Sequence, residues 1–316
     1  MSLVKCDRHT RPRRHVLRDM TLTTKPTRPD WLTTQDWPHP LYAFDLDGRR
    51  VVYTDTGGDR PVLLMVHAGL WSLLWADLIS HLEDRYRCVT LDLPGTGLSD
   101  PGEATVASAA HTITSFIDHL DLDAVTLVVH DLGGLATLAA VHDRVDRVAA
   151  LVAMNTFGWR PRGMLWLALR FFGSELMREV NAWLGLLAWA SGTRFGVGRQ
   201  WNRTRKTAWR RGLHDRDRRR FLHRMFRDAT RDRATATRAE STVTALAGRP
   251  MMTVFGRLGD YFFFVRRWRR LFPGLTRVTV PWGLHFPMAD NPQLVADAID
   301  RWHRSHVDRA SHRCPL

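Results

Sequence analysis

The stretch that most constrains the fold runs from Val125 to Gly134 and reads VTLVVHDLGG. Its apolar, β-branched first half predicts a buried strand that ends at Asp131. Two glycines follow, and the next residues have the pattern of a helix. A strand that turns sharply into a helix holds its turn residue in a strained, exposed position, and nearby glycines let the helix backbone approach the strand. The usual form of this turn is G-x-S-x-G, so an aspartate replaces the serine here.

Further strands alternate with helical patterns on both sides of this turn. The predicted strands lie at 41–46, 50–55, 62–66, 88–93, 125–131, 148–154, 251–256 and 276–280. The first two flank Asp47-Gly48 and are expected to form a hairpin. Alternation of the other strands with helices predicts parallel pairing, right-handed crossovers and active residues at the carboxyl ends of the strands. We therefore predict an α/β fold with a mostly parallel eight-stranded sheet and helices on both faces.

The region from 157 to 247 interrupts this alternation. It has no convincing strand and is rich in arginine and tryptophan, which favours a helical insertion. We expect a core at 39–156 and 248–305, with the inserted helices forming a cap at 157–247. The basic first segment, 1–38, is expected to be a disordered extension, and 306–316 a tail.

Composition excludes several classes of protein. The net charge of +14 comes almost wholly from arginine, since the chain has three lysines, and no base-stacking or groove-reading motif accompanies it. We therefore expect no nucleic-acid partner. Three widely spaced cysteines imply neither a disulfide framework nor a metal cluster, and no phosphate loop is present, so we expect no metal and no organic cofactor.

Two regions bear on location. The first 35 or so residues contain no apolar run long enough for a secretory signal, so a cytoplasmic location is expected. The longest apolar region, 164–190, contains four charged residues and is a poor membrane span. Its tryptophans and flanking arginines still suit peripheral contact with a membrane surface. The sequence does not indicate an oligomeric state.

Four landmarks occur together and in a fixed order. They are the turn at His67, the segment from Asp92 to Ser99 that contains GTGLS, the HDLGG turn, and GLHFP at 283–287. In these features the sequence resembles the α/β-hydrolase fold family over residues 40–305. The HDLGG turn is similar to the branch with an aspartate nucleophile, which contains haloalkane dehalogenases, epoxide hydrolases and fluoroacetate dehalogenases. In that branch a helical cap covers the site.

The resemblance implies a catalytic triad of Asp131, His285 and Asp260. A carboxylate is ionised near neutral pH and needs no base to attack carbon, so Asp131 would form an alkyl ester with the substrate. His285 would then activate water to hydrolyse the ester, and Asp260 would orient the imidazole. Asn155 lies at the other position where this branch has its acid, but an amide carries no charge.

The resemblance also implies an oxyanion hole made of two backbone N–H groups. One belongs to Leu132, the residue after the nucleophile, and we assign the other to Gly69 in the turn after His67. The family usually has His-Gly-x-Pro at that turn, whereas this chain has His-Ala-Gly-Leu.

The substrate class is narrowed by residues that are missing. Epoxide hydrolases of this fold use two cap tyrosines, and no tyrosine lies between Tyr86 and Tyr261. Leu132 replaces both the arginine of fluoroacetate dehalogenases and the halide-binding tryptophan of haloalkane dehalogenases. Trp71, Trp159 and Asn155 are candidates to contact substrate or halide, although large aromatic side chains more often fill cores.

The best interpretation is a haloalkane dehalogenase-like hydrolase acting on a small apolar substrate. A strained lactone or an epoxide-type electrophile remains an alternative. A different class also remains: an inactive relative whose basic, tryptophan-rich cap binds a membrane surface or an acidic partner.

Overall fold

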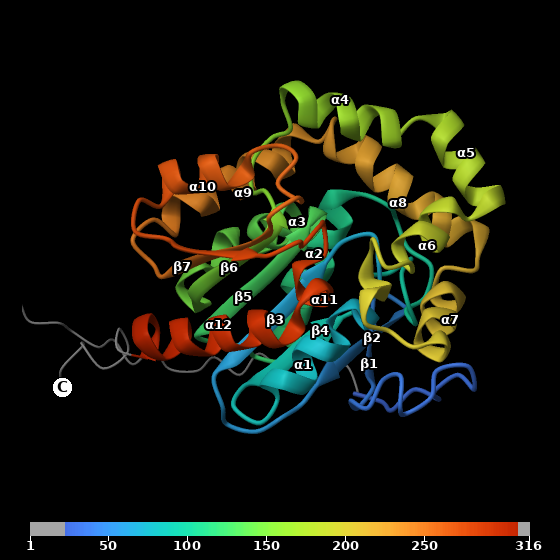
Figure 1. Ribbon diagram of the computed structural model, residues 1–316, viewed down its shortest axis with the longest axis horizontal. Helices are drawn as coiled ribbons and strands as arrows, with labels where there is room; N and C mark the ends of the chain where they lie inside the picture. Colours follow the sequence, from blue (N-terminus) through green and yellow to red (C-terminus); the bar gives the residue numbers. More distant parts are fainter. Residues whose placement is uncertain (1–22, 309–316) are drawn as a thin grey trace, which may run out of the picture.

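An eight-stranded sheet forms the centre of the computed structural model, which describes residues 23–308 (Figure 1). The strands lie in the order β1-β2-β4-β3-β5-β6-β7-β8, and β2 is antiparallel to both of its neighbours while the others pair in parallel. Their bounds are β1 (Tyr42–Leu46), β2 (Arg49–Asp55), β3 (Val62–His67), β4 (Arg87–Leu91), β5 (Val125–Asp131), β6 (Val148–Thr156), β7 (Met251–Gly256) and β8 (Thr276–Val280). The predicted fold class is confirmed.

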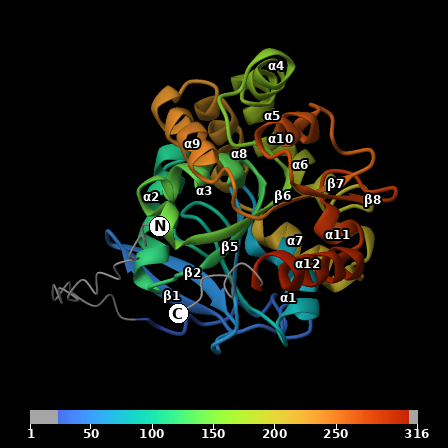
Figure 2. The same cartoon turned by 90° about the vertical axis from the view of Figure 1, so that its left-hand side faces the viewer.

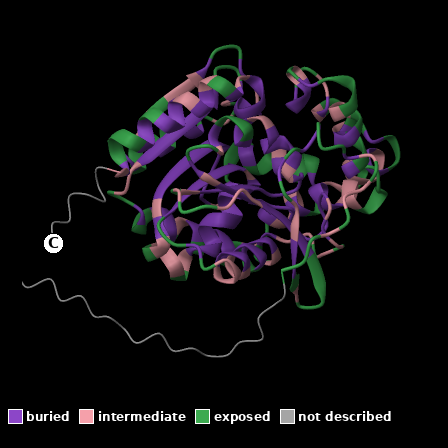
Figure 3. Ribbon diagram, turned by 90° about the horizontal axis from the view of Figure 1, so that it is seen from below, coloured by how far each residue is buried: buried purple, intermediate pink, exposed green. Residues whose placement is uncertain are grey.

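Helices cover both faces of the sheet, as Figure 2 shows. One face carries α2 (Val106–His119), α3 (Leu132–Ala140), α9 (Arg233–Ala245) and α10 (Phe264–Leu271), and the other carries α1 (Ala76–Leu82), α11 (Pro287–Asp290) and α12 (Pro292–His306). Strand β5 serves both layers because its side chains alternate: Leu127 and Val129 join the first core, and Val128 joins the second. The central strands are therefore buried on both faces (Figure 3).

The remaining helices form a cover beside the carboxyl ends of the strands (Figure 1). They are α4 (Gly163–Phe172), α5 (Glu175–Leu184), α6 (Leu186–Ser191), α7 (Arg203–Gly212) and α8 (Arg216–Ala229). Helix α9 lies inside the range that we assigned to the cap, but it packs against α3 and so belongs to the core layer. We use the name cover for α4–α8.

The amino-terminal prediction needs correction for residues 23–38. Thr24 pairs with Ala43 of β1, and the side chains of Leu32 and Trp37 are buried in the core beside α1. The hydroxyl of Thr204 in α7 donates to Asp36 at 3.1 Å. The segment has few apolar residues and no periodicity, so its burial depends on contacts with distant parts of the chain. Residues 1–22 of the expected extension lie outside the described residues.

The predicted start of the carboxyl-terminal tail, at residue 306, is also too early. Helix α12 continues to His306, and Val307 is buried. Residues 309–316 lie outside the described residues.

Candidate active site

The turn between β5 and α3 has the strained geometry that its sequence predicts. Asp131 adopts a φ of 50° and a ψ of −133°, which is unfavourable for a residue with a side chain. A Cβ atom at Gly133 would lie 2.5 Å from the carbonyl oxygen of Val66, and one at Gly134 would lie 2.1 Å from the hydroxyl of Thr156. Only glycine therefore lets α3 lie so close to β3 and β6.

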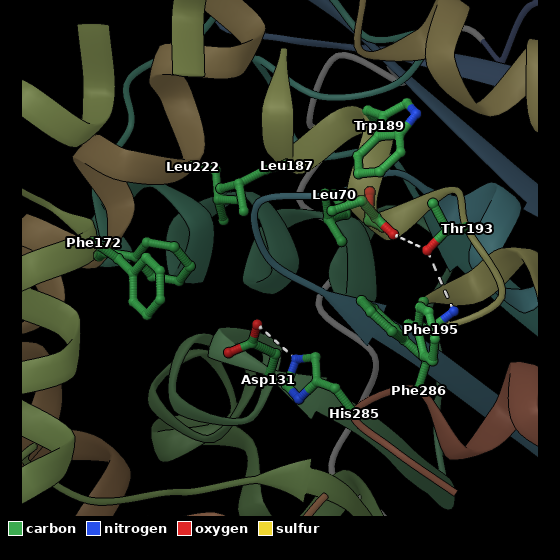
Figure 4. Close-up of a pocket in the computed structure, with 14 residues that line it drawn as sticks. Leu70, Asp131, Phe172, Leu187, Trp189, Thr193, Phe195, Leu222, His285 and Phe286 are labelled. Carbon is green, nitrogen blue, oxygen red and sulfur yellow. Dashed lines mark hydrogen bonds and ion pairs between the residues drawn. The ribbon is translucent and has the colours of Figure 1, made fainter. Parts of the chain in front are cut away.

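Asp131 is held as a carboxylate. Its Oδ2 lies 3.3 Å from Nε2 of His285 (Figure 4). The hydroxyl of Thr156 donates to the backbone carbonyl of Asp131 at 2.5 Å. Burial alone would raise the pKa of Asp131, but the hydrogen bond from His285, the nearby His130 and the N–H of Leu132 together hold it below its ordinary value. The strained turn thus presents an ionised oxygen beside an imidazole.

His67 also faces this carboxylate, although the sequence analysis used it only as a landmark. Its Nε2 lies 3.9 Å from Asp131 Oδ2, and its Nδ1 accepts the backbone N–H of Leu70 at 3.2 Å. Burial and, second, the neighbouring imidazole of His285 lower the pKa of His67 to about 3, so the ring of His67 is neutral near pH 7. Because Nδ1 accepts, the proton is on Nε2 and points towards Asp131. In the sequence, the position of His67 at the end of a buried strand was the signal that could have identified it as a site residue.

The loop that carries His285 is fixed from the core and from the cover. His130, buried beside Asp131, contacts the carbonyl oxygen of His285 through Nε2 at 2.8 Å. Asp290 accepts the N–H of Leu284 at 2.6 Å, and Nε of Arg199 lies 3.2 Å from the same carboxylate. Arg199 lies between α6 and α7, so the cover helps to set the position of the imidazole.

The structure does not bring Asp260 to His285. Its carboxylate accepts the backbone N–H of Phe264 at 2.7 Å and that of Val265 at 3.3 Å, at the start of α10. Within residues 23–308, no hydrogen bond or ion pair joins Asp260 to His285. The expected contact is wrong because the first N–H groups of a helix have no partner inside the helix and attract a nearby carboxylate.

Asn155 lies close to Asp131 and His285, and its side chain forms hydrogen bonds to the end of β7 and to the turn after it. It is buried at the end of β6 with a φ of 38°. Its amide donates to the carbonyl of Gly259 at 2.8 Å, and its oxygen accepts the N–H of Gly256 at 3.2 Å. The side chain therefore joins the end of β6 to the turn after β7.

The two backbone donors expected for the oxyanion hole come from two different turns, one after β5 and one after β3. Leu132 is the first residue of α3 and is buried. Gly69 has a φ of 105°, and a Cβ there would lie 2.4 Å from the side chain of Leu222 in α8. Glycine at 69 thus allows the turn after β3 to pass beneath the cover.

The two tryptophans expected near the substrate pack elsewhere. Trp71 lies between Trp31 and Trp209, with ring centroids 5.9 Å and 6.1 Å away. Trp159 packs against Trp268 at 4.8 Å, and the guanidinium of Arg267 lies 4.3 Å from its ring. Neither lines a cavity that contains Asp131. The structure gives both the packing role that is usual for large aromatic side chains.

Asp131 and His285 lie where two apolar cavities meet. The larger has a volume of about 600 Å³, which suits a small apolar molecule (Figure 4). Its lining consists of Leu70, Asp131, Phe172, Leu187, Trp189, Ala190, Ser191, Thr193, Phe195, Gly196, Leu222, Phe226, His285 and Phe286. The smaller, about 170 Å³, adds Asn155, Phe157 and residues of α4 and of the loop before α10. Asp131 and His285 therefore face surroundings with few other polar groups.

The side chains around these cavities do not form a metal-ligand set. In the described part of the chain, no group of three or more His, Cys, Asp or Glu side chains is arranged to hold a metal ion.

Curated proteins with similar sequences include dehalogenases and a decarboxylase. Haloalkane dehalogenase 2 of Mycobacterium tuberculosis (strain ATCC 25618 / H37Rv) is 37% identical over 128 residues, which is 40% of this chain and 45% of that protein. The cis-3-alkyl-4-alkyloxetan-2-one decarboxylase of Shewanella oneidensis is 27% identical over 176 residues, which is 52% of this chain and 54% of that protein. The chain thus spans about half the length of the curated relatives it matches.

Solved structures extend the likeness over most of the chain. A loop variant of a haloalkane dehalogenase from Bradyrhizobium elkanii superimposes with a TM-score of 0.73 and 18% identity, covering 86% of this chain and 98% of that one. At this identity the likeness is one of fold. The family model for the alpha/beta hydrolase fold matches residues 61–292 and so includes the turn at Asp131 and the loop of His285. The chain therefore belongs to the α/β-hydrolase fold family.

Proposed function

We propose that this protein is a hydrolase that attacks an electrophilic carbon with Asp131, and that small apolar haloalkanes are its leading substrate class. One observation carries the proposal: an ionised carboxylate on a strained turn, 3.3 Å from an imidazole, faces an apolar cavity of about 600 Å³. The haloalkane dehalogenases among its relatives support the substrate class.

In the first step, a carboxylate oxygen of Asp131 attacks the carbon that bears the halogen. A carbon–oxygen bond forms, the carbon–halogen bond breaks, and the halide leaves with the bonding electrons. An apolar cavity favours this step because it offers the carboxylate few competing hydrogen bonds. The product is an alkyl ester on Asp131.

In the second step, His285 takes a proton from water while the water oxygen attacks the ester carbonyl. The backbone N–H groups of Leu132 and Gly69 are the proposed donors to the developing oxyanion. Collapse of this intermediate releases the alkoxide, which takes the proton of the imidazolium and leaves as the alcohol. The carboxylic acid left on Asp131 then loses its proton to solvent, which restores the carboxylate. No hydrogen bond or ion pair joins Asp260 to His285 within the described residues, and we propose that Asp290, which holds the loop of His285, supplies the nearby negative charge.

A strained lactone is the second candidate, and two observations favour it. Leu132, Trp71 and Trp159 provide no side-chain donor beside Asp131 for a departing halide. The oxetan-2-one decarboxylase among the relatives is named for a four-membered lactone. Attack of Asp131 on the saturated ring carbon that is bonded to the ring oxygen would form a carbon–oxygen bond and break the bond from that carbon to the ring oxygen. The leaving group would be a carboxylate of the same molecule, so no halide site would be needed.

Trapping the covalent ester on Asp131 would distinguish the haloalkane from the lactone as substrate. The His285→Gln variant lacks the base for the second step, so we expect it to accumulate the covalent intermediate. It would be mixed with 1-bromobutane, 1-chlorobutane or a cis-3,4-dialkyloxetan-2-one and measured by intact-protein mass spectrometry with peptide mapping. A haloalkane would add only its alkyl group, whereas a lactone would add its whole mass.

The adduct should map to Asp131 and be absent from a His285→Gln/Asp131→Asn double variant. If the folded single variant forms no adduct with any of these compounds, the proposed nucleophilic function is wrong. Binding by the cover would then become the leading interpretation.

A further inference from the structure

The outer surface of the cover exposes large apolar side chains at helical spacing. On α4, Met164, Leu167 and Phe171 are exposed, while Leu165 and Leu169 on the same helix are buried. A helix that is apolar on all sides normally has both sides covered. The apolar cover face, as we name it, comprises Met164, Trp166, Leu167, Phe171, Leu176, Trp183, Leu184, Leu186, Trp189 and Phe195. They come from α4, α5, α6 and the loop after α6.

Arginines lie among these side chains and stack on their rings. The guanidinium of Arg216 lies 3.6 Å from the ring centroid of Trp183, and that of Arg170 lies 5.3 Å from Trp166. The guanidinium of Arg194 lies 4.9 Å from the ring centroid of Phe195. Within the described residues, none of these three arginines forms an ion pair, so their charges are available to a partner.

The acidic side chains of α5, Glu175 and Glu179, are already paired. Glu175 binds Arg227 at 2.8 Å, and Glu179 binds both Arg178 and Arg220. These pairs lower the pKa of Glu179 to about 2, so it remains a paired anion near neutral pH. The face therefore combines exposed apolar groups with uncompensated positive charge, on a chain whose net charge is +14.

We propose that the apolar cover face docks on a membrane that contains anionic phospholipid. Tryptophan and phenylalanine enter the boundary between head groups and acyl chains, and arginines on long side chains bind the phosphates. A symmetric dimer through this face would bring the unpaired guanidinium groups of two copies together, which like-charge repulsion opposes. Lipid phosphates satisfy those charges.

The docking is peripheral, with the helices of the cover lying in the plane of the membrane surface. No helix within residues 23–308 is long and apolar enough to cross a bilayer. Helices α4 and α5 have ten residues each and α6 has six. Their outward apolar side chains are suited to shallow insertion.

The larger cavity opens towards this face. Phe172, Trp189 and Phe195 are exposed at the surface and also line the cavity that contains Asp131 (Figure 4). A docked protein would present that opening to the acyl chains, where apolar molecules concentrate. This route for substrate rests on the proposed function, whereas the docking itself does not.

Flotation of the full chain with lipid vesicles tests the proposal. One set of vesicles would be pure phosphatidylcholine and the other would contain 30 mol% phosphatidylserine, each at low and high NaCl. We expect binding to the anionic vesicles, a blue shift of tryptophan emission, and loss of binding as salt screens the arginines.

Two variants separate the charged and apolar contributions. The R170Q/R194Q/R216Q triple variant should lose roughly 100-fold in partitioning, since each basic side chain near an anionic surface contributes about fivefold. The matched control R49Q/R277Q/R301Q removes the same charge from exposed arginines on β2, β8 and α12 and should change partitioning less than about twofold. L176Q/W183Q should also abolish binding without altering far-UV circular dichroism.

Equal loss in the cover and control triple variants would overturn the proposal, since net charge alone would then explain binding. So would a folded protein that binds neither kind of vesicle. A concentration-dependent dimer in light scattering that L176Q/W183Q dissociates, without vesicle binding, would overturn it too and identify a second copy as the occupant. Catalysis plays no part in these measurements, so they stand apart from the trapping experiment.

Discussion

The carboxyl ends of the central strands and the cover above them differ in what determines their structure. Around Asp131, backbone approach through glycine and buried hydrogen bonds leave little freedom. The cover instead exposes many apolar side chains and is joined to the core by arginines, such as Arg218, which donates to the carbonyl of Ser99 at 3.0 Å. From this comparison we propose that the core positions Asp131 and His285 and that the cover controls access to them.

Removing the reacting carboxylate is expected to have the largest effect on the core side of this comparison. Asp131→Asn retains the shape of the side chain but removes the charge that attacks carbon. Turnover should fall by about 1,000-fold or more. Hydrolysis rates with the substrate identified by trapping, together with thermal unfolding, would measure this. Near-normal turnover in the variant would contradict the proposed role of Asp131.

Adding one methyl group beneath the turn should show how tightly the core is packed. Gly133→Ala would place Cβ 2.5 Å from the carbonyl oxygen of Val66, which belongs to a central strand and cannot move easily. We expect a loss of about 1–3 kcal/mol in the free energy of unfolding. Gly274→Ala is the matched control because nothing lies within 4 Å of the added atom. Equal stability of the two variants in urea denaturation would show that the turn is less constrained than we infer.

Acid should destabilise the protein through histidines buried beside Asp131. The pKa of His67 is lowered to about 3, and that of His130 is also lowered by burial, so both are neutral in the folded state while the unfolded chain protonates them. The unfolded state therefore binds more protons below about pH 6.5, and each such histidine should cost about 1.4 kcal/mol per pH unit. The pKa of Asp131 is lowered too, so its contribution is lost only at still lower pH.

Denaturant unfolding at pH 7.5, 6 and 5 would measure this slope. His67→Gln should reduce this slope of unfolding free energy against pH by about 1.4 kcal/mol per pH unit, the contribution of one histidine. An unchanged slope would mean that His67 is protonated in the folded protein.

Removing the carboxylate of Asp260 should have the smallest effect. Asp260→Ala loses two hydrogen bonds to the start of α10, and we expect about 1 kcal/mol of destabilisation. Turnover should fall less than about tenfold, because the side chain does not contact His285. Asp290→Asn, which loosens the loop of His285, should reduce turnover more. The reverse order in steady-state assays would restore Asp260 as the third member of the triad.

Much of the fold follows from local sequence. The eight strands, the sharp turn at Asp131 and the glycines after it could be predicted because apolar runs and glycine spacing act over a few residues. The lack of a strand pattern from 157 to 247 indicated the region of the cover helices, whereas His285 was assigned through the resemblance to the α/β-hydrolase fold family. These features do not depend on which distant segment lies beside them.

Other features depend on competition between partners that are far apart in the chain. Asp260 binds the start of α10 instead of His285, and Trp71 packs between two other tryptophans. In the segment 23–38, Leu32 and Trp37 are buried beside α1, and Asp36 accepts a hydrogen bond from α7. His67 comes to lie beside Asp131 because β3 and β5 are neighbours in the sheet, where His67 pairs with His130. A carboxylate, an indole or an imidazole has several suitable partners in any chain. Which partner it finds is decided only when the tertiary structure places one of them within reach and buries the pair.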